Sequence, residues 1–143
     1  YGYTACFRET GDTLFLQEAV HVADMIRKRN TAPDLICYWD FDAPNIPDEP
    51  RDASAGAIIA SALLELSQYV NDDKLSKEYQ SVASQQLRTL SSDEYLAAPQ
   101  TNGGFILKHS VGNKPRNSEV DAPLTYADYY YVEALLRYKK LLQ

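Results

Sequence analysis

The segment from Ala53 to Val70 constrains the fold most, because as a helix it would carry apolar side chains in nearly every direction. Its apolar residues include Ala55, Ile58, Ile59, Ala60, Ala62, Leu63, Leu66 and Val70. A helix with almost no polar face is typical of one that is covered on nearly all sides. A chain that contains such a helix must supply, or meet, packing partners around it.

The segments on either side of this helix, about 13–29 and 74–90, are amphipathic. Each carries a single apolar stripe at helical spacing. The stripes are Phe15, Ala19, Val22, Ala23 and Ile26 in the first, and Leu75, Tyr79, Val82, Ala83, Leu87 and Leu90 in the second. Two more helices are predicted, one ending before Gly11 and one over about 126–142. Because little of the sequence alternates as a strand would, the predicted fold class is all-α with about five helices.

The order of these helices indicates an internal repeat. A shift of 60 positions aligns Asp12, Glu18, Val22 and Ala23 with Asp72, Glu78, Val82 and Ala83. The repeated unit is then a buried inner helix, a short turn and an amphipathic outer helix. Chance similarity of two amphipathic helices is the alternative, because four identities are few. Repeats of this length predict stacked helical hairpins, in a solenoid or a closed ring, and five helices are too few to close one.

The two long connections, Tyr38–Asp52 and about 91–125, each join an outer helix to the next inner helix. The opposite turns, near Gly11 and Asp72, are short. We therefore expect both long loops at the N-terminal end of the inner helices, close to each other. Long ordered loops are usually functional, and helix N-termini carry partial positive charge. This end is predicted to bind an anionic ligand.

Composition narrows the possible partners. A net charge of −6 and a pI near 4.8 argue against binding to nucleic acid, which requires a basic surface. No apolar run approaches the roughly 20 residues of a membrane span, so no membrane partner is predicted. Cys6 and Cys37 fit no metal or redox spacing and are expected to be buried free thiols.

Three segments resemble the C-terminal part of the unsaturated glucuronyl hydrolases, glycoside hydrolase family 88. They read YGYTACFRETGDTLFLQEAVHVAD, YWDFDAPNIPDEPRDASAGAIIASALLEL and LKHSVGNKPRNSEVDAPLTYADYYYVEALLRYKKLL. The resemblance covers essentially the whole chain. It implies that residues 1–143 are the C-terminal portion of one (α/α)6-barrel domain whose N-terminal half is absent. The pocket of such a barrel would open at the loop-rich end.

The resemblance also implies a reaction. Enzymes of this family hydrate the 4,5-double bond of an unsaturated uronic acid at the non-reducing end of lyase-generated oligosaccharides. An aspartic acid protonates C4, water adds at C5, and the hemiketal collapses to release the next sugar, without metal or cofactor. The catalytic aspartates would lie upstream of Tyr1, so no catalytic residue is expected here, and the chain alone is expected to be inactive.

The expected partners are therefore a glycosaminoglycan-type unsaturated oligosaccharide and the missing half of the barrel. The compartment stays open, with a bacterial cytoplasm or periplasm as the expectation. Two alternatives remain at this point. One is the related unsaturated rhamnogalacturonyl hydrolase family, against which the string WDFDAPNIPDEPRDASA argues. The other is a non-catalytic helical solenoid that binds a protein, against which the unequal loops argue, because solenoids usually repeat their loops.

Seven residues are candidates for substrate binding: Trp39, Asp40, Arg51, Asp52, Ser110, Asn113 and Lys114. In the first loop, Trp39 could stack on a sugar ring or anchor its loop. Arg51 could attract an anionic sugar or clamp the acidic loop, and Asp52 could cap the following helix. Asp40 could bind sugar hydroxyls or organise its own turn.

The second loop gathers Ser110, Asn113 and Lys114 around Gly112. A hydroxyl, an amide and an ammonium suit a sulfate or carboxylate on the second sugar, although a solvated turn is an equal alternative. By resemblance, a similar loop with Ser and Lys serves sulfated sugars in some family members. Asn113 stands where another Ser would be expected, which argues against a preference for sulfate.

Overall fold

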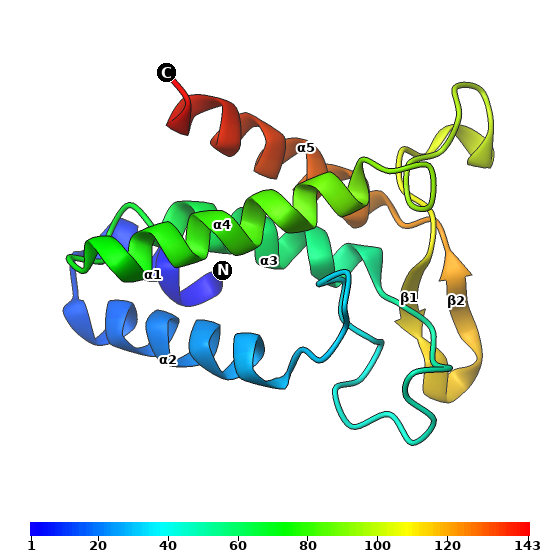
Figure 1. Ribbon diagram of the computed structural model, residues 1–143, viewed down its shortest axis with the longest axis horizontal. Coiled ribbons are helices and arrows are strands. Elements are labelled where there is room, and N and C mark those ends of the chain that lie inside the picture. The colour runs from blue at the N-terminus through cyan, green and yellow to red at the C-terminus, as the bar shows by residue number, and fades with distance from the viewer.

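The computed structural model describes residues 1–143 and contains five helices and one β-hairpin (Figure 1). The helices are α1 (Gly2–Thr10), α2 (Thr13–Arg29), α3 (Ala53–Leu66), α4 (Asp73–Leu90) and α5 (Thr125–Leu141). Strands β1 (Ser110–Asn113) and β2 (Ser118–Ala122) pair antiparallel within the second long connection. The helical framework is thus confirmed. The hairpin was not predicted, because strands this short show too few alternating positions.

Aspartate side chains start the three central helices. Asp12, Asp52 and Asp72 are N-caps whose carboxylates accept a hydrogen bond from the backbone N–H two residues on, at 2.9, 3.0 and 2.8 Å. Such caps satisfy N–H groups that have no partner inside the helix. Gly11 ends α1 with a φ of 70°, a conformation that favours glycine. The third helix ends at Leu66, earlier than predicted, in a turn.

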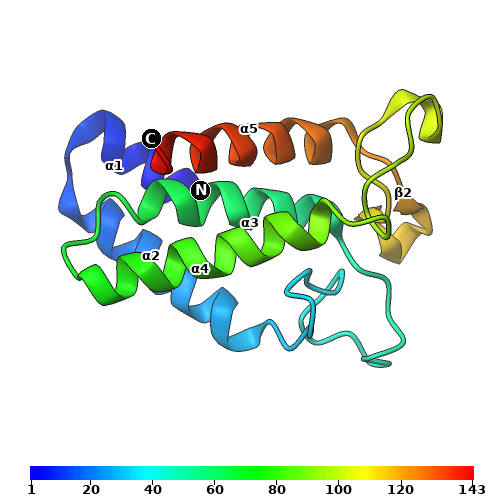
Figure 2. The same ribbon diagram turned by 45° about the horizontal axis from the view of Figure 1, so that its top comes forward.

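The helices form two layers of sequential antiparallel hairpins (Figures 1 and 2). Helices α1, α3 and α5 form the inner layer and run in one direction, whereas α2 and α4 form the outer layer and run in the opposite one. Helix α3 lies at the centre, packed mainly against α4 and α5. This arrangement confirms the predicted hairpins.

Helix α3 is the most buried helix, as predicted, with ten of its 14 residues in the core. Ala53, Ala57 and Ala60 are completely buried, and their small side chains let neighbouring elements approach closely. Gly56 faces Ile36 so tightly that a Cβ at this position would lie 2.8 Å from the Ile36 Cδ1 atom. The small residues at the start of α3 therefore make room for the first long loop.

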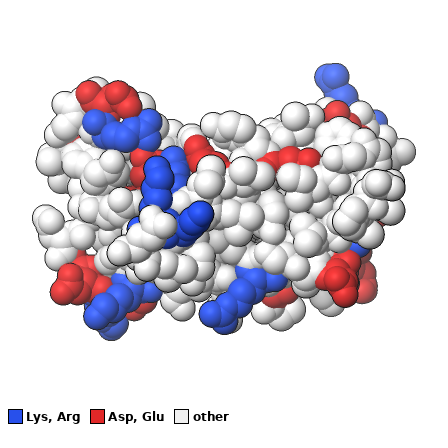
Figure 3. All heavy atoms as spheres, turned by 90° about the horizontal axis from the view of Figure 1, so that it is seen from above, with Lys and Arg blue, Asp and Glu red and all other residues white.

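The prediction that α5 is more deeply buried than both outer helices holds against α2 but is wrong against α4. Helix α5 buries three of 17 residues, whereas α2 buries two of 17 and α4 buries five of 18. Its exposed large apolar residues are Tyr126, Tyr129, Val132, Leu135 and Leu136. Figure 3 shows the face seen from above α5, with broad areas free of charged side chains. The reason is that α5 packs against α3 and, less extensively, α4, and no element of this chain covers its other side.

The cysteine prediction is correct for only one thiol. Cys37 is buried at 3% exposure beside the start of α3, and both cysteines are free. Cys6 is exposed, because it lies on α1, which has few packing partners in this chain.

A network of ion pairs ties the inner helices together, and sequence analysis missed it. The nearly buried carboxylate of Glu65 on α3 lies 2.7 Å from Nη2 of Arg137 on α5 and also pairs with Arg8 on α1. Arg137 Nη1 also donates a hydrogen bond to the backbone oxygen of Ser61, at 2.8 Å, and Glu133 accepts one from the Ser61 hydroxyl. These contacts fix α1 and α5 relative to α3.

Candidate functional site

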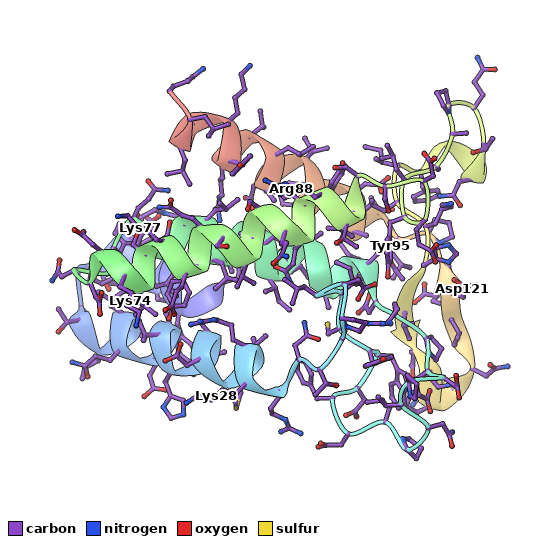
Figure 4. All side chains as sticks on the ribbon, in the orientation of Figure 1. Lys28, Lys74, Lys77, Arg88, Tyr95 and Asp121 are labelled. Carbon is purple, nitrogen blue, oxygen red and sulfur yellow. The ribbon has the colours of Figure 1, made fainter.

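The two long loops lie together at one end of the helices, where α3 and α5 begin (Figure 1). Figure 4 shows this arrangement, with Tyr95 and Asp121 at the loop-bearing end and Lys74 and Lys77 at the other. The loops also contact each other, because the backbone N–H of Val111 donates to Asp52 Oδ1 at 3.2 Å. The prediction that both loops share one end and meet there is confirmed.

Arg51 holds the first loop in place. Its Nη1 atom lies 2.9 Å from Asp34 Oδ1 and 2.6 Å from the backbone oxygen of Ile36. The guanidinium also lies over the ring of Tyr38, 4.1 Å from the ring centroid. The second Asp34 oxygen accepts a hydrogen bond from the Tyr95 hydroxyl at 2.9 Å. Arg51 thus clamps an acidic residue of the preceding loop, and its contact with substrate stays a prediction.

Tyr95 lies deep in this cluster. Burial, followed by the hydrogen bond to Asp34, raises the pKa of the Tyr95 phenol well above its usual value. Its ring meets the ring of His109 edge-on, with centroids 6.0 Å apart. The phenol is therefore a fixed hydrogen-bond donor that joins the segment after α4 to the first loop.

Asp52 caps α3 and also anchors the β-hairpin. Its Oδ1 atom accepts hydrogen bonds from the Ser54 N–H at 3.0 Å, the Ser54 hydroxyl at 2.6 Å and the Val111 N–H at 3.2 Å. The exposed Tyr126 lies nearby on α5, and its pKa is raised by burial first and then by the charge of Asp52. One carboxylate therefore joins the first loop, the helix and the hairpin.

Glu49 is the functional candidate that sequence analysis missed. Although acidic, it is only 8% exposed. Its carboxylate accepts hydrogen bonds from Trp39 Nε1 at 2.9 Å and Asn45 Nδ2 at 3.1 Å, and it lies 3.4 Å from Lys114 Nζ. The pKa of Glu49 is lowered, mainly by the hydrogen bond from Trp39. Desolvation acts in the opposite direction, whereas Asn45 and Lys114 lower the pKa further. Its neighbour Asp48 is exposed, and no sequence pattern tells which of the two acids points inward.

Glu49 unites two predicted site residues from different loops. Lys114 Nζ lies 5.6 Å from the centroid of the Trp39 ring, so the ammonium faces both the indole and the carboxylate. Trp39 and Lys114 are each partly exposed. Trp39, Lys114 and Glu49 therefore form a composite surface that could hold a sugar ring and an anionic group.

Asp40, Ser110 and Asn113 make no hydrogen bond or ion pair with the side chains of Trp39, Glu49 or Lys114. Asp40 is exposed and accepts a hydrogen bond from the Asp42 N–H at 2.8 Å, which is the turn-forming role that we considered for it. Ser110 is completely buried, and its hydroxyl has no hydrogen-bond partner. Asn113 is half-buried at the end of β1. The structure thus does not bring the Ser110 hydroxyl to the surface shared by Lys114.

The second loop holds several residues in an unusual backbone conformation. His109, Asn117, Glu119 and Asp121 have φ values between 51° and 61°, which residues other than glycine rarely adopt. The His109 ring contacts the Asp121 carboxylate across the hairpin. Such positions persist only where surrounding contacts enforce them, and they concentrate at functional sites.

Two cavities lie away from the loops. A groove of about 460 Å³ runs between α2 and α4, and an apolar cavity of about 90 Å³ lies among α1, α2 and α3. No three or more His, Cys, Asp or Glu side chains are grouped so that they could hold a metal ion. No helix has the length and apolar character needed to cross a membrane.

Comparison with known proteins identifies the relatives. The chain is 46% identical, over 99% of its length, to an unsaturated glucuronyl hydrolase of Formosa agariphila, and 32% identical to one of Bacillus sp. strain GL1. It matches a crystal structure of an unsaturated glucuronyl hydrolase specific for heparin with a TM-score of 0.95 and 52% identity, over 99% of the chain. By sequence and fold, the chain belongs with the unsaturated glucuronyl hydrolases. No family model matches it.

The unsaturated glucuronyl hydrolases are considerably longer than this chain. It spans 35% and 37% of the two curated relatives and 38% of the heparin-specific structure. An unsaturated chondroitin disaccharide hydrolase of Streptococcus pyogenes is also similar, at 33% identity over 108 residues. The resemblance found in the sequence is confirmed, and the five helices are part of an (α/α)6 barrel.

Proposed function

We propose that a protein carrying this chain within a complete barrel hydrates the 4,5-double bond of unsaturated uronic acids and releases the next sugar. The observation that carries the proposal is the match to unsaturated glucuronyl hydrolases over 99% of the chain, at 46% identity. Residues 1–143 supply the C-terminal portion of that single barrel domain. Within it, the chain forms one side of the loop-bearing end.

The proton donor comes from the part of the barrel outside this chain. The carboxylates that join the loops already serve as structural acceptors: Asp34 for Arg51 and Tyr95, and Asp52 for the start of α3. Glu49 has a lowered pKa, whereas a general acid needs a pKa close to the working pH. The chain alone therefore lacks a positioned acid for C4, and we propose that it is inactive by itself.

The substrate is an oligosaccharide whose non-reducing end is an unsaturated uronic acid. Among the solved relatives, one is specific for heparin, one is complexed with dGlcA-GalNAc6S, and another title names dGlcA-Glc-Rha-Glc. In this chain, Trp39 offers an aromatic face and Lys114 a positive charge at the loop-bearing end. The N-termini of α3 and α5 add partial positive charge there. These features support an anionic, glycosaminoglycan-type substrate.

The rest of the barrel also accounts for the exposed face of α5. A helix with Tyr129, Leu135 and Leu136 exposed has an apolar surface that soluble proteins normally cover. In the proposed barrel, the next inner helix packs against it. The rest of the barrel thus completes both the hydrophobic core and the pocket.

Product analysis tests the proposal. The complete protein is incubated with lyase-generated unsaturated disaccharides from heparin and chondroitin, and the products are followed by mass spectrometry. We expect the uronic acid to gain one water and the second sugar to be released as a free reducing sugar. Absence of both products with every unsaturated uronide tested, from a folded protein, would refute the function.

A further inference from the structure

Glu49 is a nearly buried acid at the loop-bearing end that touches side chains of both loops. Trp39 and Asn45 belong to the first loop and Lys114 to the second, and all three contact the Glu49 carboxylate. The Glu49 side chain is 4% exposed, while the Lys114 side chain is 32% exposed. The carboxylate thus lies beneath the ammonium, and a ligand would meet Lys114 first.

This placement gives Lys114 a counter-ion before any ligand arrives. An anion that approaches the Lys114 ammonium must compete with a carboxylate 3.4 Å away. The same carboxylate fixes the indole of Trp39, because it accepts the hydrogen bond from Nε1. Charge-assisted hydrogen bonds are stronger and more directional than neutral ones, so the carboxylate determines where both groups lie.

We propose that Glu49 is a positioning residue that fixes Trp39 and sets how strongly Lys114 attracts an anionic group on the substrate. The part that concerns substrate rests on the proposed function, since it requires this surface to face the sugar. With Glu49 charged, Lys114 orients the ligand, but an additional sulfate on the ligand adds little to its affinity. A neutral residue at position 49 would turn the same lysine into a stronger anion site.

Sulfate titration of the chain itself tests the proposal without any catalysis. Trp39 is the chain's single tryptophan, so its fluorescence reports this surface alone. Glu49→Gln keeps an oxygen that can accept from Trp39 Nε1 but removes the charge. We expect this variant to lower the sodium sulfate concentration at half-maximal response about three- to tenfold, the effect of one partly exposed charge pair, with sodium chloride correcting for ionic strength.

Two further variants separate this effect from general electrostatics. Asp48→Asn removes the same charge from an exposed neighbour that has no side-chain partner, so its midpoint should stay within about twofold of the original. Combining Glu49→Gln with Lys114→Met should abolish the saturable response. If Glu49→Gln fails to fold by circular dichroism, Glu49→Asp, which withdraws the carboxylate by one methylene, should shift the midpoint in the same direction. Equal midpoints for the position-49 and position-48 variants, or a response that survives loss of Lys114, would overturn the proposal.

A kinetic experiment on the complete protein then tests the link to substrate. Glu49→Gln should increase kcat/KM for a sulfated relative to an unsulfated unsaturated disaccharide about three- to tenfold, mainly through KM, whereas Asp48→Asn should not. An unchanged preference in an active enzyme would contradict the role of Glu49 in specificity. If the unmodified protein turns over no unsaturated uronide, the proposed function fails, and the sulfate titration still decides whether Glu49 controls Lys114.

Discussion

Replacing Arg51 with alanine should destabilise the whole chain, because this side chain holds the first loop against the core. The replacement removes a contact to Asp34 at 2.9 Å, a hydrogen bond to Ile36 at 2.6 Å and the stacking over Tyr38. The Arg51 and Asp34 side chains are 21% and 31% exposed, so solvent screens the ion pair only in part. Allowing for that screening, we expect a loss of about 2–3 kcal/mol in the free energy of unfolding.

Urea unfolding followed by circular dichroism measures this loss, and thermal unfolding should show a melting temperature lowered by about 5–10 °C. Arg51→Lys should lose about half as much, since an ammonium keeps the charge but not the planar fork and its stacking. Arg88→Ala is the control, because Arg88 is exposed on α4 (Figure 4) and makes no ion pair. Its free energy of unfolding should change by less than about 0.5 kcal/mol.

A double-mutant cycle isolates the contact itself. Arg51→Ala and Asp34→Asn should each destabilise the chain, and the double variant should lose less than the sum, with a coupling energy of about 1 kcal/mol. A coupling energy near zero, or an Arg51→Ala variant as stable as Arg88→Ala, would refute the assignment of Arg51 as a clamp of this loop.

Three other predictions concern thiols, acid and the inner helices. At pH 8 a thiol reagent should label Cys6 rapidly and Cys37 only on unfolding, since burial raises the pKa of Cys37 to about 12. Rapid labelling of both cysteines in the folded protein would contradict the burial of Cys37. Because the folded-state pKa of Glu49 lies below its ordinary value of 4.5, the stability it contributes should be present above that pH and lost as pH falls through the lowered pKa. When the urea midpoint of unfolding is plotted against pH, Glu49→Gln should reduce this acid-dependent loss. An unchanged plot would contradict the contacts of Glu49 with Trp39 and Lys114. Arg137→Met should cost about 2 kcal/mol in urea unfolding, because the nearly buried Glu65 carboxylate would keep only the more exposed Arg8 as its partner. Adding Glu65→Gln should restore part of this loss, and no recovery would show that the loss is not electrostatic.

The helical framework could be predicted because its signals are local. The stripe over residues 13–29 matches the bounds of α2, which Asp12 caps. The position of the loops followed from chain order alone, since each long connection leads into an inner helix. The spacing of apolar residues, the helix N-caps and the order of helices and loops depend on residues close in sequence, so they can be predicted without the tertiary structure.

Features that depend on distant contacts could not be predicted. Helix α5 has the composition of an inner helix, but its burial depends on what covers it, and this chain covers one side only. Glu49 and Asp48 are adjacent acids in one loop, and only the tertiary fold turns Glu49 toward Trp39 and Lys114. The partner of Arg51 proved to be Asp34, 17 residues away. Irregular loops have no periodic sequence pattern, so the partners of these residues could not be predicted.

The central claim is that this chain forms one side of a barrel that hydrates unsaturated uronides. The most direct measurement is the ultraviolet absorbance of the conjugated double bond of an unsaturated glycosaminoglycan disaccharide after adding equal molar amounts of either the complete protein or residues 1–143. The account predicts that absorbance disappears with the complete protein and stays constant with the isolated chain. Turnover by the isolated chain would contradict the placement of the proton donor, and a constant absorbance with the folded complete protein, across heparin and chondroitin disaccharides, would contradict the function.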